Sequence, residues 1–541
     1  MSRSTRTLLI GAAVYSRSEP FATALLIDDG IITWVGDDAG AKVHRDIADN
    51  VVDLNGAFLA PGFVDSHVHA ASTGLRLLGL DLSHTRSARD VLEAVSAKAK
   101  DVRGALIYGH GWDQSTWSDP TLPTRSELDR ASWGSEVYLS RIDVHSALVS
   151  SALIARAPAA RSLEGFSDSG FVIREAHHVL REETLTRISV HDRTAAHAET
   201  LAAAARAGIV ALHEMGGPTI GGADDLRDLL RLSQEQPGPI VFGYWGELAR
   251  DGGIDTAREV GAIGVGGDLF VDGSLGSHTA CLSEAYADLP NVHGTQYLSG
   301  DEITQHIVEV TRAGMQGGFH VIGDAACSSV TAGFQRAGEI VGVDTLRARN
   351  HRLEHAEMLS EADISTLVTV GAAFSMQPLF DGYWGGLDGM YSTRLGRERA
   401  QTMNRFATII AQGGHLTLNS DSPVTPMDPW AILRAATEHS VPAEQLTARA
   451  AFTAMTRGAW RAVGDHRAGA IAVGSPAHLA AWSVEDLEVR VPDERVQGWS
   501  TDPRSATPGL PILDGPDPVC LATWVDGDPI FGREFLEVQR G

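Results

Sequence analysis

The sequence predicts an α/β protein, a distorted (β/α)8 (TIM) barrel with a small β-sandwich-like domain formed by both termini and a long insertion after the first barrel strand. Three observations support this prediction. Short apolar runs alternate with helical segments through the middle of the chain, which is typical of βαβ units and a parallel sheet. Both ends are rich in short strands and turns. A long interval without a clear strand separates the first two barrel strands, and we interpret it as the insertion.

Eight apolar runs form the predicted barrel, the number that a closed (β/α)8 barrel requires. The first is GFVDSHVHA, at Gly62–Ala70. Segments rich in Ala, Leu, Glu and Arg separate the others, and these residues favour helices. The other seven runs are predicted at 208–216, 239–246, 267–276, 317–326, 351–358, 371–378 and 415–423.

The domain boundaries are predicted from changes in this rhythm. Residues 1–58 contain TALLIDDGIITWVGDD, in which two apolar runs flank an Asp-Asp-Gly turn and indicate a hairpin. Residues 468–541 have similar strands and turns, so we expect both ends to form one split β-domain. The barrel is predicted at 59–467, with an inserted subdomain at approximately 73–200.

The composition limits the partners that the protein can have. The chain has 541 residues, of which 43% are hydrophobic and 21% charged, as in an ordinary soluble globular protein. A formal net charge of −25 argues against nucleic acid and against anionic membranes as partners. Cys281, Cys327 and Cys520 form no disulfide framework or metal-binding CxxC pair, which fits the reducing cytoplasm. The oligomeric state stays open, a homo-oligomer included.

Potential metal ligands recur at the carboxyl ends of the predicted strands. His67 and His69 are two residues apart, so in a strand both imidazoles face the same side. Barrel active sites are built at the carboxyl ends of several strands. Four histidines and one aspartate at such positions predict a metal site, because imidazole and carboxylate groups are common ligands of divalent ions. The five predicted ligands are His67, His69, His320, His355 and Asp421.

Seven motifs occur in order along the chain, namely PGFVDSHVH, GHGWDQ, LPTRSELD, DGSLGSHTA, HVIGDAA, RLEHAEM and NSDSPV. They resemble the amidohydrolase superfamily, specifically its amidohydrolase-3 (YtcJ-like) branch, which includes N-substituted formamide deformylase. The resemblance covers essentially the whole chain and implies metal-dependent hydrolysis of a small-molecule substrate. It implies that His67, His69 and Asp421 hold one metal and that Asp421 accepts the proton of the attacking water. His320 and His355 would hold a second metal, or ligate a single ion and orient the water.

The chain departs from this branch at Asp268, where a lysine is usual. In many members of the superfamily that lysine is carboxylated and bridges two metals. The only lysines here are Lys42, Lys98 and Lys100, so a carboxylated lysine is excluded at this position. Asp268 could ligate the metal directly or through water, and we favour a position outside the ligand shell, where it would orient a histidine. We expect one divalent ion rather than two, with zinc favoured.

Further residues are candidates for the substrate pocket, and each has a structural alternative. The segment from His110 to Asp113 could instead be a loop that packs on itself, and His145 would have to reach the site from the insertion. His177 and His178 lie in a polar helical stretch and are expected to be solvated. The pocket candidates are His110, Trp112, Asp113, His145, Asp272, His278 and Asp324.

The predicted function is that of a metal-dependent amidohydrolase. It would cleave a non-peptide C–N bond of an amide, N-formyl or N-acyl compound with metal-activated water. Hydrolytic deamination and ester hydrolysis use the same chemistry and remain alternatives. A different class of protein also remains: a non-catalytic barrel of the same superfamily that acts in binding or assembly. The missing lysine favours that class, and the five retained ligands oppose it.

Overall fold

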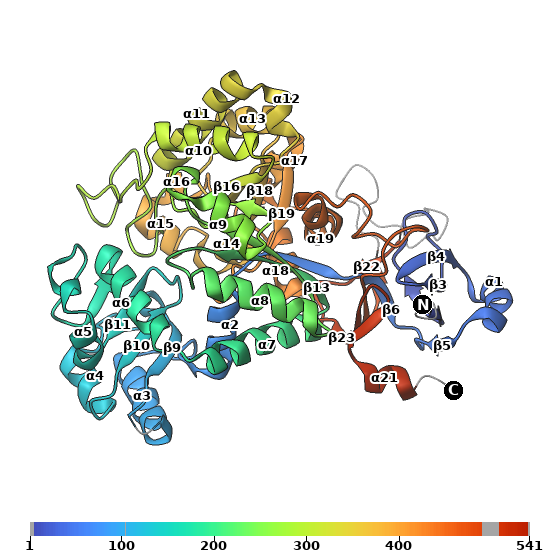
Figure 1. Ribbon diagram of the computed structural model, residues 1–541, viewed down its shortest axis with the longest axis horizontal. Helices are drawn as coiled ribbons and strands as arrows, with labels where there is room; N and C mark the ends of the chain where they lie inside the picture. The colour runs from blue at the N-terminus through green and yellow to red at the C-terminus, as the bar shows by residue number, and fades with distance from the viewer. Residues whose placement is uncertain (1–4, 103, 489–507, 539–541) are drawn as a thin grey trace.

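The computed structural model describes residues 5–102, 104–488 and 508–538. At its centre, eight parallel strands form one sheet, and neighbouring strands follow each other in chain order (Figure 1). The first and last strands meet, because the Asp421 amide donates to the His67 carbonyl at 3.0 Å and the His69 amide to the Ser422 carbonyl at 2.9 Å. The predicted distorted (β/α)8 barrel is confirmed. Its strands are β7 (Phe63–Val68), β13 (Ile209–Gly216), β14 (Ile240–Trp245), β15 (Gly264–Val265), β16 (Gln316–Val321), β17 (Arg352–His355), β18 (Ala373–Met376) and β19 (His415–Leu418).

Helices cover the outside of the barrel and connect its strands. In α10 (Gly300–Arg312), Ser299 and Glu302 form a capping box that satisfies amides of the first turn. Ile303, Ile307 and Val310 recur at helical spacing and are fully buried against the sheet. Burial of each such side chain contributes about 1.5–3 kcal/mol. Other covering helices are α7 (Val190–Arg206), α8 (Ala223–Glu235), α9 (Gly253–Val260), α11 (Asp324–Val341), α13 (Glu361–Thr369), α17 (Phe406–Ala411) and α18 (Pro429–Thr437).

The fourth barrel strand differs from the prediction. β15 contains only Gly264 and Val265, whereas we expected a strand at 267–276. Gly266 and Gly267 follow with φ angles of 145° and 78°, which side chains other than glycine rarely allow. A Cβ atom at Gly266 would lie 2.3 Å from the Gly318 amide nitrogen. The chain is therefore irregular at these two glycines and pairs with β16 again at Phe270, where the His320 amide donates to the Leu269 carbonyl at 3.1 Å and the Val271 amide to the His320 carbonyl at 3.0 Å.

The segment between the first two barrel strands builds a five-stranded sheet of its own beside the barrel (Figure 1, at the lower left). This sheet contains β8 (Leu80–Asp81), β9 (Ile107–Trp112), β10 (Val137–Arg141), β11 (Ser146–Val149) and β12 (Phe171–Ile173). Its helices are α3 (Ala88–Val102), α4 (Arg125–Ala131), α5 (Ser151–Arg156) and α6 (Arg174–Thr186). The helices that precede and follow this sheet in the sequence, α2 (Ala70–Leu78) and α7, pack against each other. The Thr200 hydroxyl of α7 donates to the Ala70 carbonyl of α2 at 2.7 Å. The sheet lies inside the predicted range 73–200, whose exact limits stay a prediction.

Strands from both ends of the chain share a second five-stranded sheet. It contains β2 (Ala13–Val14), β6 (Phe58–Pro61), β20 (Leu479–Ser483), β23 (Val519–Val525) and β24 (Asp528–Phe531) in that order. β6 and β20 are antiparallel, with Pro61 opposite Leu479. A four-stranded sheet of N-terminal strands packs beside it, and Ile27 and Trp524 lie in one apolar cluster. This is the pairing expected of a split β-domain, whose limits at 58 and 468 stay a prediction. The four N-terminal strands are β1 (Arg6–Ile10), β3 (Ala24–Asp28), β4 (Ile31–Gly36) and β5 (Asn50–Asp53).

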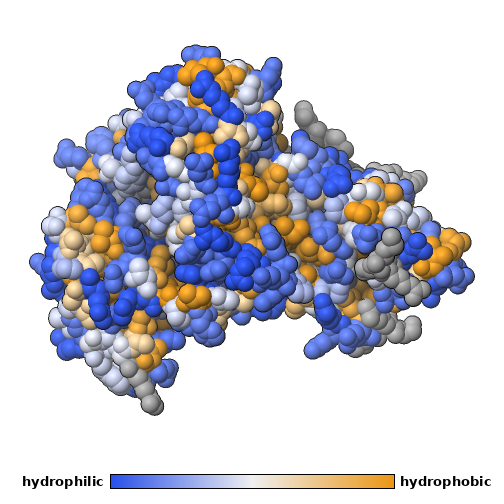
Figure 2. Space-filling model, viewed as in Figure 1, coloured by the Kyte–Doolittle hydropathy of each residue, from blue (hydrophilic) through white to orange (hydrophobic). Residues whose placement is uncertain are grey.

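The surface is largely hydrophilic on the face that Figure 2 shows, with scattered apolar groups. Val43 is 75% exposed in the short 3-10 helix Lys42–Ile47, at the far edge of the N-terminal sheet. Single exposed apolar side chains of this kind are ordinary on soluble domains. Among the described helices, none is long and apolar enough to cross a membrane.

Candidate metal centre

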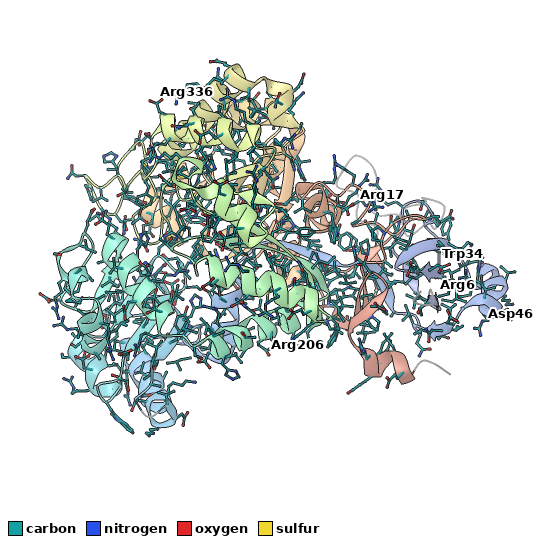
Figure 3. The ribbon with its side chains drawn as sticks, in the orientation of Figure 1. Arg6, Arg17, Trp34, Asp46, Arg206 and Arg336 are labelled. Carbon is teal, nitrogen blue, oxygen red and sulfur yellow. The ribbon has the colours of Figure 1, made fainter. Side chains whose placement is uncertain are left out.

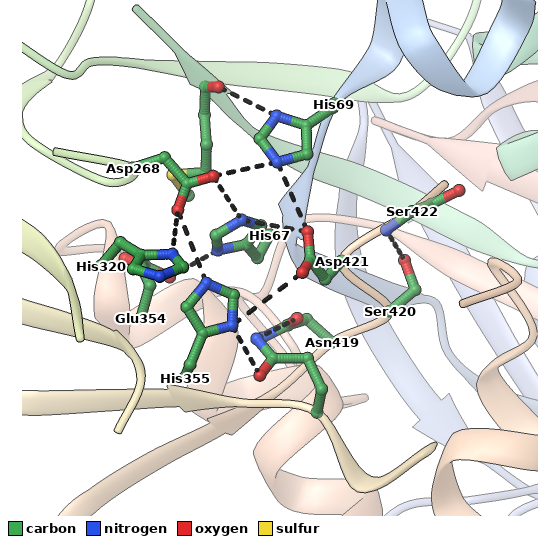
Figure 4. Close-up of polar contacts among 12 residues, drawn as sticks. His67, His69, Asp268, His320, Glu354, His355, Asn419, Ser420, Asp421 and Ser422 are labelled. Atoms are coloured by element: carbon green, nitrogen blue, oxygen red, sulfur yellow. Dashed lines mark hydrogen bonds and ion pairs between the residues drawn. The ribbon is translucent and has the colours of Figure 1, made fainter. Parts of the chain in front are cut away.

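Four histidines and two aspartates meet at the carboxyl ends of five barrel strands (Figure 4). Each residue lies at or just after the carboxyl end of its strand, as in other barrel enzymes. All six side chains are buried, with residue exposures of 5% or less. They are His67 in β7, His69 after β7, Asp268 after β15, His320 in β16, His355 at the end of β17 and Asp421 after β19.

Asp268 lies in the middle of this group. Its Oδ2 is 3.0 Å from His69 Nε2 and 3.5 Å from His67 Nε2. Its Oδ1 is 3.5 Å from His320 Nδ1 and 3.6 Å from His355 Nε2. The carboxylate therefore lies between the two pairs of histidines.

Asp421 approaches the same histidines from the opposite side. Its Oδ1 is 3.3 Å from His67 Nε2 and 3.4 Å from His69 Nε2. Its Oδ2 is 3.9 Å from His355 Nδ1. Asp421 has a φ angle of 51° and His355 one of 67°, and such left-handed backbone costs about 1–3 kcal/mol at a residue with a side chain. Strain of this kind persists where the surrounding structure holds a functional geometry.

The donor atoms that face the centre are suited to a divalent metal ion. Buried polar atoms almost always have a hydrogen-bond partner, and leaving one unpaired costs about 1–3 kcal/mol. A divalent cation satisfies imidazole nitrogens and carboxylate oxygens together. Two sets have ligand atoms within 4.8 Å of one another: His67, His69 and Asp421, and His67, Asp268 and His355. The unpartnered atoms are His67 Nε2, His320 Nδ1, His355 Nε2, Asp268 Oδ1 and Asp421 Oδ1.

The second ring nitrogen of each histidine is held by an acceptor outside the centre. A histidine that donates one N–H outward presents the lone pair of its other nitrogen to the centre. The orientation of all four rings is thus fixed by residues that do not touch the ion site. The outer contacts are His67 Nδ1 to Glu354 Oε2 at 2.8 Å, His69 Nδ1 to the Met215 carbonyl at 3.1 Å, His320 Nε2 to the Gly273 carbonyl at 3.3 Å and His355 Nδ1 to Gln377 Oε1 at 3.1 Å.

Glu354 is part of the site, although the sequence did not single it out. It is fully buried, and Arg352 Nη2 donates to its Oε2 at 3.0 Å. Burial disfavours its charge, yet Arg352 and His67 lower the pKa of Glu354 to about 2. The ionised carboxylate therefore accepts the Nδ1–H of His67. The alternation of Arg352 and Glu354 in β17 is the signal that could have shown them on one face of the strand.

A cavity lies above the centre. Its walls are largely apolar and include Phe270, Phe380 and Trp384, and the insertion contributes Val144 and His145. The free volume is about 50 Å³.

The charges of the cavity wall are only partly balanced. Arg141 is buried and pairs with Asp113 at 2.5 Å and with Asp143 at 2.8 Å. Arg181 of α6 also lines the cavity and is half-buried. Within the described part of the chain, Arg181 forms no ion pair or hydrogen bond. Glu357, which the sequence analysis also missed, lines the wall near His355, and burial raises the pKa of its carboxyl group to about 7.

Of the seven predicted pocket residues, His145 lines the cavity, and its ring centre lies 5.6 Å from that of His320. The other six do not line it. His110 donates from Nε2 to the Pro423 carbonyl at 3.0 Å, and the Trp112 indole donates to the Leu139 carbonyl at 2.9 Å. Asp113 holds Arg141 in place. These three support the wall from behind.

The remaining three candidates hold loops around the centre. Asp272 is fully buried and accepts the amides of Cys281, Ile322 and Gly323 at 2.8–3.0 Å. His278 pairs with Asp288 at 3.1 Å, near the surface. Asp324 accepts the Ser283 amide at 3.0 Å. Their contacts connect segments of the chain and do not face a substrate.

The expectation that His177 and His178 are solvated is wrong. Both line the cavity, and His177 is 1% exposed and lies 2.8 Å from the Tyr138 hydroxyl through its Nε2. The stretch is polar in composition, but its face with Ala176, His177, Leu180 and Thr184 packs inward. Burial lowers the pKa of both imidazoles, so they are neutral side chains in this wall.

Comparison with known proteins agrees with this geometry. A model of the amidohydrolase family matches residues 50–531. The putative amidohydrolase YtcJ of Bacillus subtilis is 27% identical over 441 residues, which cover 75% of this chain and 78% of that protein. The N-substituted formamide deformylase of Arthrobacter pascens is 22% identical over 441 residues, or 76% and 79% of the two chains. Protein LONG AFTER FAR-RED 3 of Arabidopsis thaliana is 26% identical over 511 residues, or 87% and 85%.

A solved structure agrees as well. The crystal structure of an uncharacterized metal-dependent hydrolase from Pyrococcus furiosus superimposes with a TM-score of 0.70 at 27% identity, and covers 88% of this chain and 98% of its own. The resemblance that the motifs predicted is thereby confirmed, and so is the expectation of an enzyme. The chain belongs to the amidohydrolase family and is a metal-dependent amidohydrolase.

Proposed function

We propose that this enzyme hydrolyses a non-peptide C–N bond in a small amide, N-formyl or N-acyl compound. The observation that supports this proposal is the set of unpartnered nitrogen and oxygen atoms at the floor of a largely apolar cavity. A divalent ion held there supplies a Lewis acid for the scissile carbonyl and makes water nucleophilic near neutral pH. The apolar walls exclude bulk water and strengthen the electrostatic interactions at the reacting atoms.

We propose that His67, His69 and Asp421 hold this ion, and that Asp268, His355 and His320 complete or support its shell. The two ligand sets share His67 Nε2. A ring nitrogen offers one lone pair, so the sets cannot each bind a separate ion through that atom. This supports one tightly held ion over two. Zinc is our choice because it commonly binds histidine together with aspartate.

Asp421 is the proton acceptor in this proposal. It lines the cavity, and its Oδ1 has no hydrogen-bond partner. A carboxylate in this position takes a proton from the attacking water and returns it to the leaving amine. His355 lies beside Asp421 Oδ2 and is fixed by Gln377, so it orients the reacting groups.

Arg181 supports a narrower class of substrate. Among the residues that the structure describes, this cation at the cavity wall has no carboxylate partner, while Arg141 is neutralised by Asp113 and Asp143. Arginine binds carboxylates through two parallel hydrogen bonds. We therefore propose substrates that have a carboxylate on one side of the scissile bond and an apolar group for Phe380 and Trp384 on the other.

The alternative functions differ in whether they need the metal centre. Hydrolytic deamination and ester hydrolysis would use the same ion and the same proton acceptor. A non-catalytic binding or assembly protein has no need of four histidines and two aspartates that converge at the floor of a cavity. The ligand set therefore favours a catalyst.

The test combines metal analysis with matched substrates. The purified protein should contain close to one equivalent of metal, and a chelator should abolish turnover that zinc then restores. N-Formyl- and N-acetyl-phenylalanine should be cleaved better than their methyl esters, and Arg181→Gln should remove this preference. If neutral amides are turned over and Arg181→Gln has no effect, only the proposed substrate carboxylate is wrong, and the amide hydrolysis stands. A metal-loaded protein inactive on amides, esters and heterocyclic amines alike would favour the binding protein.

A further inference from the structure

A group of seven arginines surrounds the amino ends of the barrel strands, at the opposite end from the metal centre. We call this group the arginine face. Its members come from segments far apart in the sequence, including the loop after β2, the end of α12 (Val343–Arg347), α19 (Ala448–Thr453) and α20 (Ala459–Ala462). Figure 3 labels one of them, Arg17, near α19 of Figure 1. The seven are Arg17, Arg347, Arg349, Arg449, Arg457, Arg461 and Arg467.

These arginines line three adjoining hollows with volumes of about 670, 490 and 410 Å³. The first two hollows share Arg347, Asn350, His415 and Arg461, and the first and third share Arg17. His415 begins β19, which places the hollows at the foot of the barrel. Ligand sites in proteins are commonly concave and span about 300–1,000 Å³. The larger hollow is therefore of a size to hold a small molecule.

No carboxylate of the described chain balances this charge. Aspartate and glutamate are absent from the described residues that line the three hollows. None of the seven arginines forms an ion pair within residues 5–102, 104–488 and 508–538. Asp465, the nearest acid in sequence to Arg467, accepts the amides of Arg467 and Ala468 at 2.7 and 3.1 Å. In a chain with a net charge of −25, such a group of unpaired cations stands out.

The guanidinium groups are also free to bind. Arg349 donates one hydrogen bond to the Gly314 carbonyl at 2.8 Å, and Arg449 donates one to the Pro508 carbonyl at 3.4 Å and also interacts with the Tyr15 hydroxyl. Each guanidinium has five N–H donors, so most donors of the arginine face remain available. Clustered like charges repel one another, and an anion bound among them removes that repulsion.

We propose that the arginine face binds a small molecule with two or more phosphate groups, at a site separate from the metal centre. Arginine suits this ligand because its planar fork donates two parallel hydrogen bonds to one phosphate. Several arginines around one hollow favour several linked phosphates over a single anion. The shared chemistry is that of an oligophosphate, either free or attached to a nucleoside.

The experiment measures binding of tripolyphosphate and of ATP to the full-length, metal-loaded protein by titration calorimetry. We expect one site for tripolyphosphate, with an affinity that falls as salt is raised. Arg347→Gln combined with Arg461→Gln should weaken binding at least about tenfold, because the double variant loses two charges and their charge-assisted hydrogen bonds to phosphate. Arg17→Gln is a second, independent variant with the same expected direction. Tighter binding of ATP would identify a nucleotide, and equal or weaker binding a free oligophosphate.

The matched control replaces Arg336 and Arg231, which are 45% and 55% exposed in their side chains and lie in other parts of the surface. It should bind as the wild type does. The proposal is overturned if tripolyphosphate fails to bind at millimolar concentration. It is also overturned if Arg347→Gln/Arg461→Gln binds like the control pair, because the phosphate would then occupy another site, such as the metal centre. Thermal unfolding of each variant shows whether a lost affinity reflects a lost fold.

Discussion

The Nδ1 atom of His67 lies 2.8 Å from the Oε2 atom of Glu354, and both side chains are completely buried. The contact is one link in a chain of hydrogen bonds that fixes the orientation of His67. Arg352 holds Glu354, Glu354 holds His67, and His67 turns its Nε2 to the centre. A carboxylate behind a metal-bound imidazole fixes the ring and raises its basicity.

Replacing Glu354 by glutamine should weaken metal binding. The amide keeps the shape of the side chain but loses the charge that accepts the His67 N–H, and such outer contacts are typically worth about 10–100-fold in affinity. Competition with a chelator measures this loss. Glu398→Gln, at an exposed residue of α16 (Arg397–Ala400), is the matched control. Equal metal affinity in both variants would show that Glu354 serves only the fold.

Asp268→Asn should remove most of the bound metal and, with it, the activity. Its carboxylate lies 3.0–3.6 Å from a ring nitrogen of all four histidines, so the neutral amide would leave the ligand shell short of a charge. Elemental analysis of the purified variant is the measurement, and Asp388→Asn, at a side chain 90% exposed, is the control. If Asp268→Asn keeps its metal and loses only about 10–100-fold in activity, Asp268 is an orienting residue.

Buried neutral histidines should make the fold sensitive to mild acid. His306 is 1% exposed, its Nδ1 accepts the Ala249 amide at 3.1 Å, and its Nε2–H faces the Val265 carbonyl at 3.2 Å. Burial lowers its pKa from the ordinary 6.5 to about 4. Between pH 6.5 and 4, His306 is protonated in the unfolded chain but stays neutral in the folded chain. The free energy of unfolding therefore falls as the pH drops through this range, by up to about 1.4 kcal/mol per pH unit.

His306→Gln tests this expectation, since an amide can keep both hydrogen bonds without titrating. Its melting temperature should fall less than that of the wild type between about pH 7 and pH 5. His84→Gln, at a side chain 89% exposed, should follow the wild-type curve. Parallel declines in His306→Gln and the wild type would contradict the assignment.

The contact between α2 and α7 should not tolerate an added methyl group. A Cβ atom on Gly74 would lie 1.9 Å from the Ala196 carbonyl oxygen of α7. Gly74→Ala should therefore destabilise the protein by at least about 1–3 kcal/mol. It should also lower metal affinity, because α2 begins directly after His69.

Gly338→Ala in α11 is the matched control, measured by denaturant unfolding alongside Gly74→Ala. Its new methyl group would meet side-chain atoms at 3.5 Å or more, an ordinary contact. Replacing a helical glycine under such conditions stabilises by about 0.4–1 kcal/mol. The same sign of change in both variants would mean that the α2–α7 distance is not the limiting contact.

The barrel and the convergence of the predicted ligands could be anticipated because both depend on local pattern. Apolar runs at regular intervals define the strands. A polar residue at the carboxyl end of a strand in a parallel barrel lies at the face where the active site is built. His67, His320 and Asp421 are of this kind. Their roles as ligands stay a prediction that metal analysis tests.

What could not be anticipated depends on packing between distant segments. β15 is interrupted at Gly266, whose backbone lies so close to Gly318 of the next strand that no Cβ atom would fit. Glu354 follows a buried strand pattern in sequence, and only the position of His67 gives it a role. His177 lies in a polar stretch, and its burial follows from the docking of α6 on Tyr138. Composition alone carries no information on these contacts.

The shared sheet of the two chain ends has a consequence for biosynthesis. β6 leads through Gly62 into β7, yet its partner β20 is made only after nearly the whole barrel has left the ribosome. Contacts between such distant segments form slowly, and until then β6 presents an open edge on which other chains can pair. We therefore expect the nascent chain to depend on chaperones for longer than an ordinary barrel, and the strand that bears His67 to be among the last to settle.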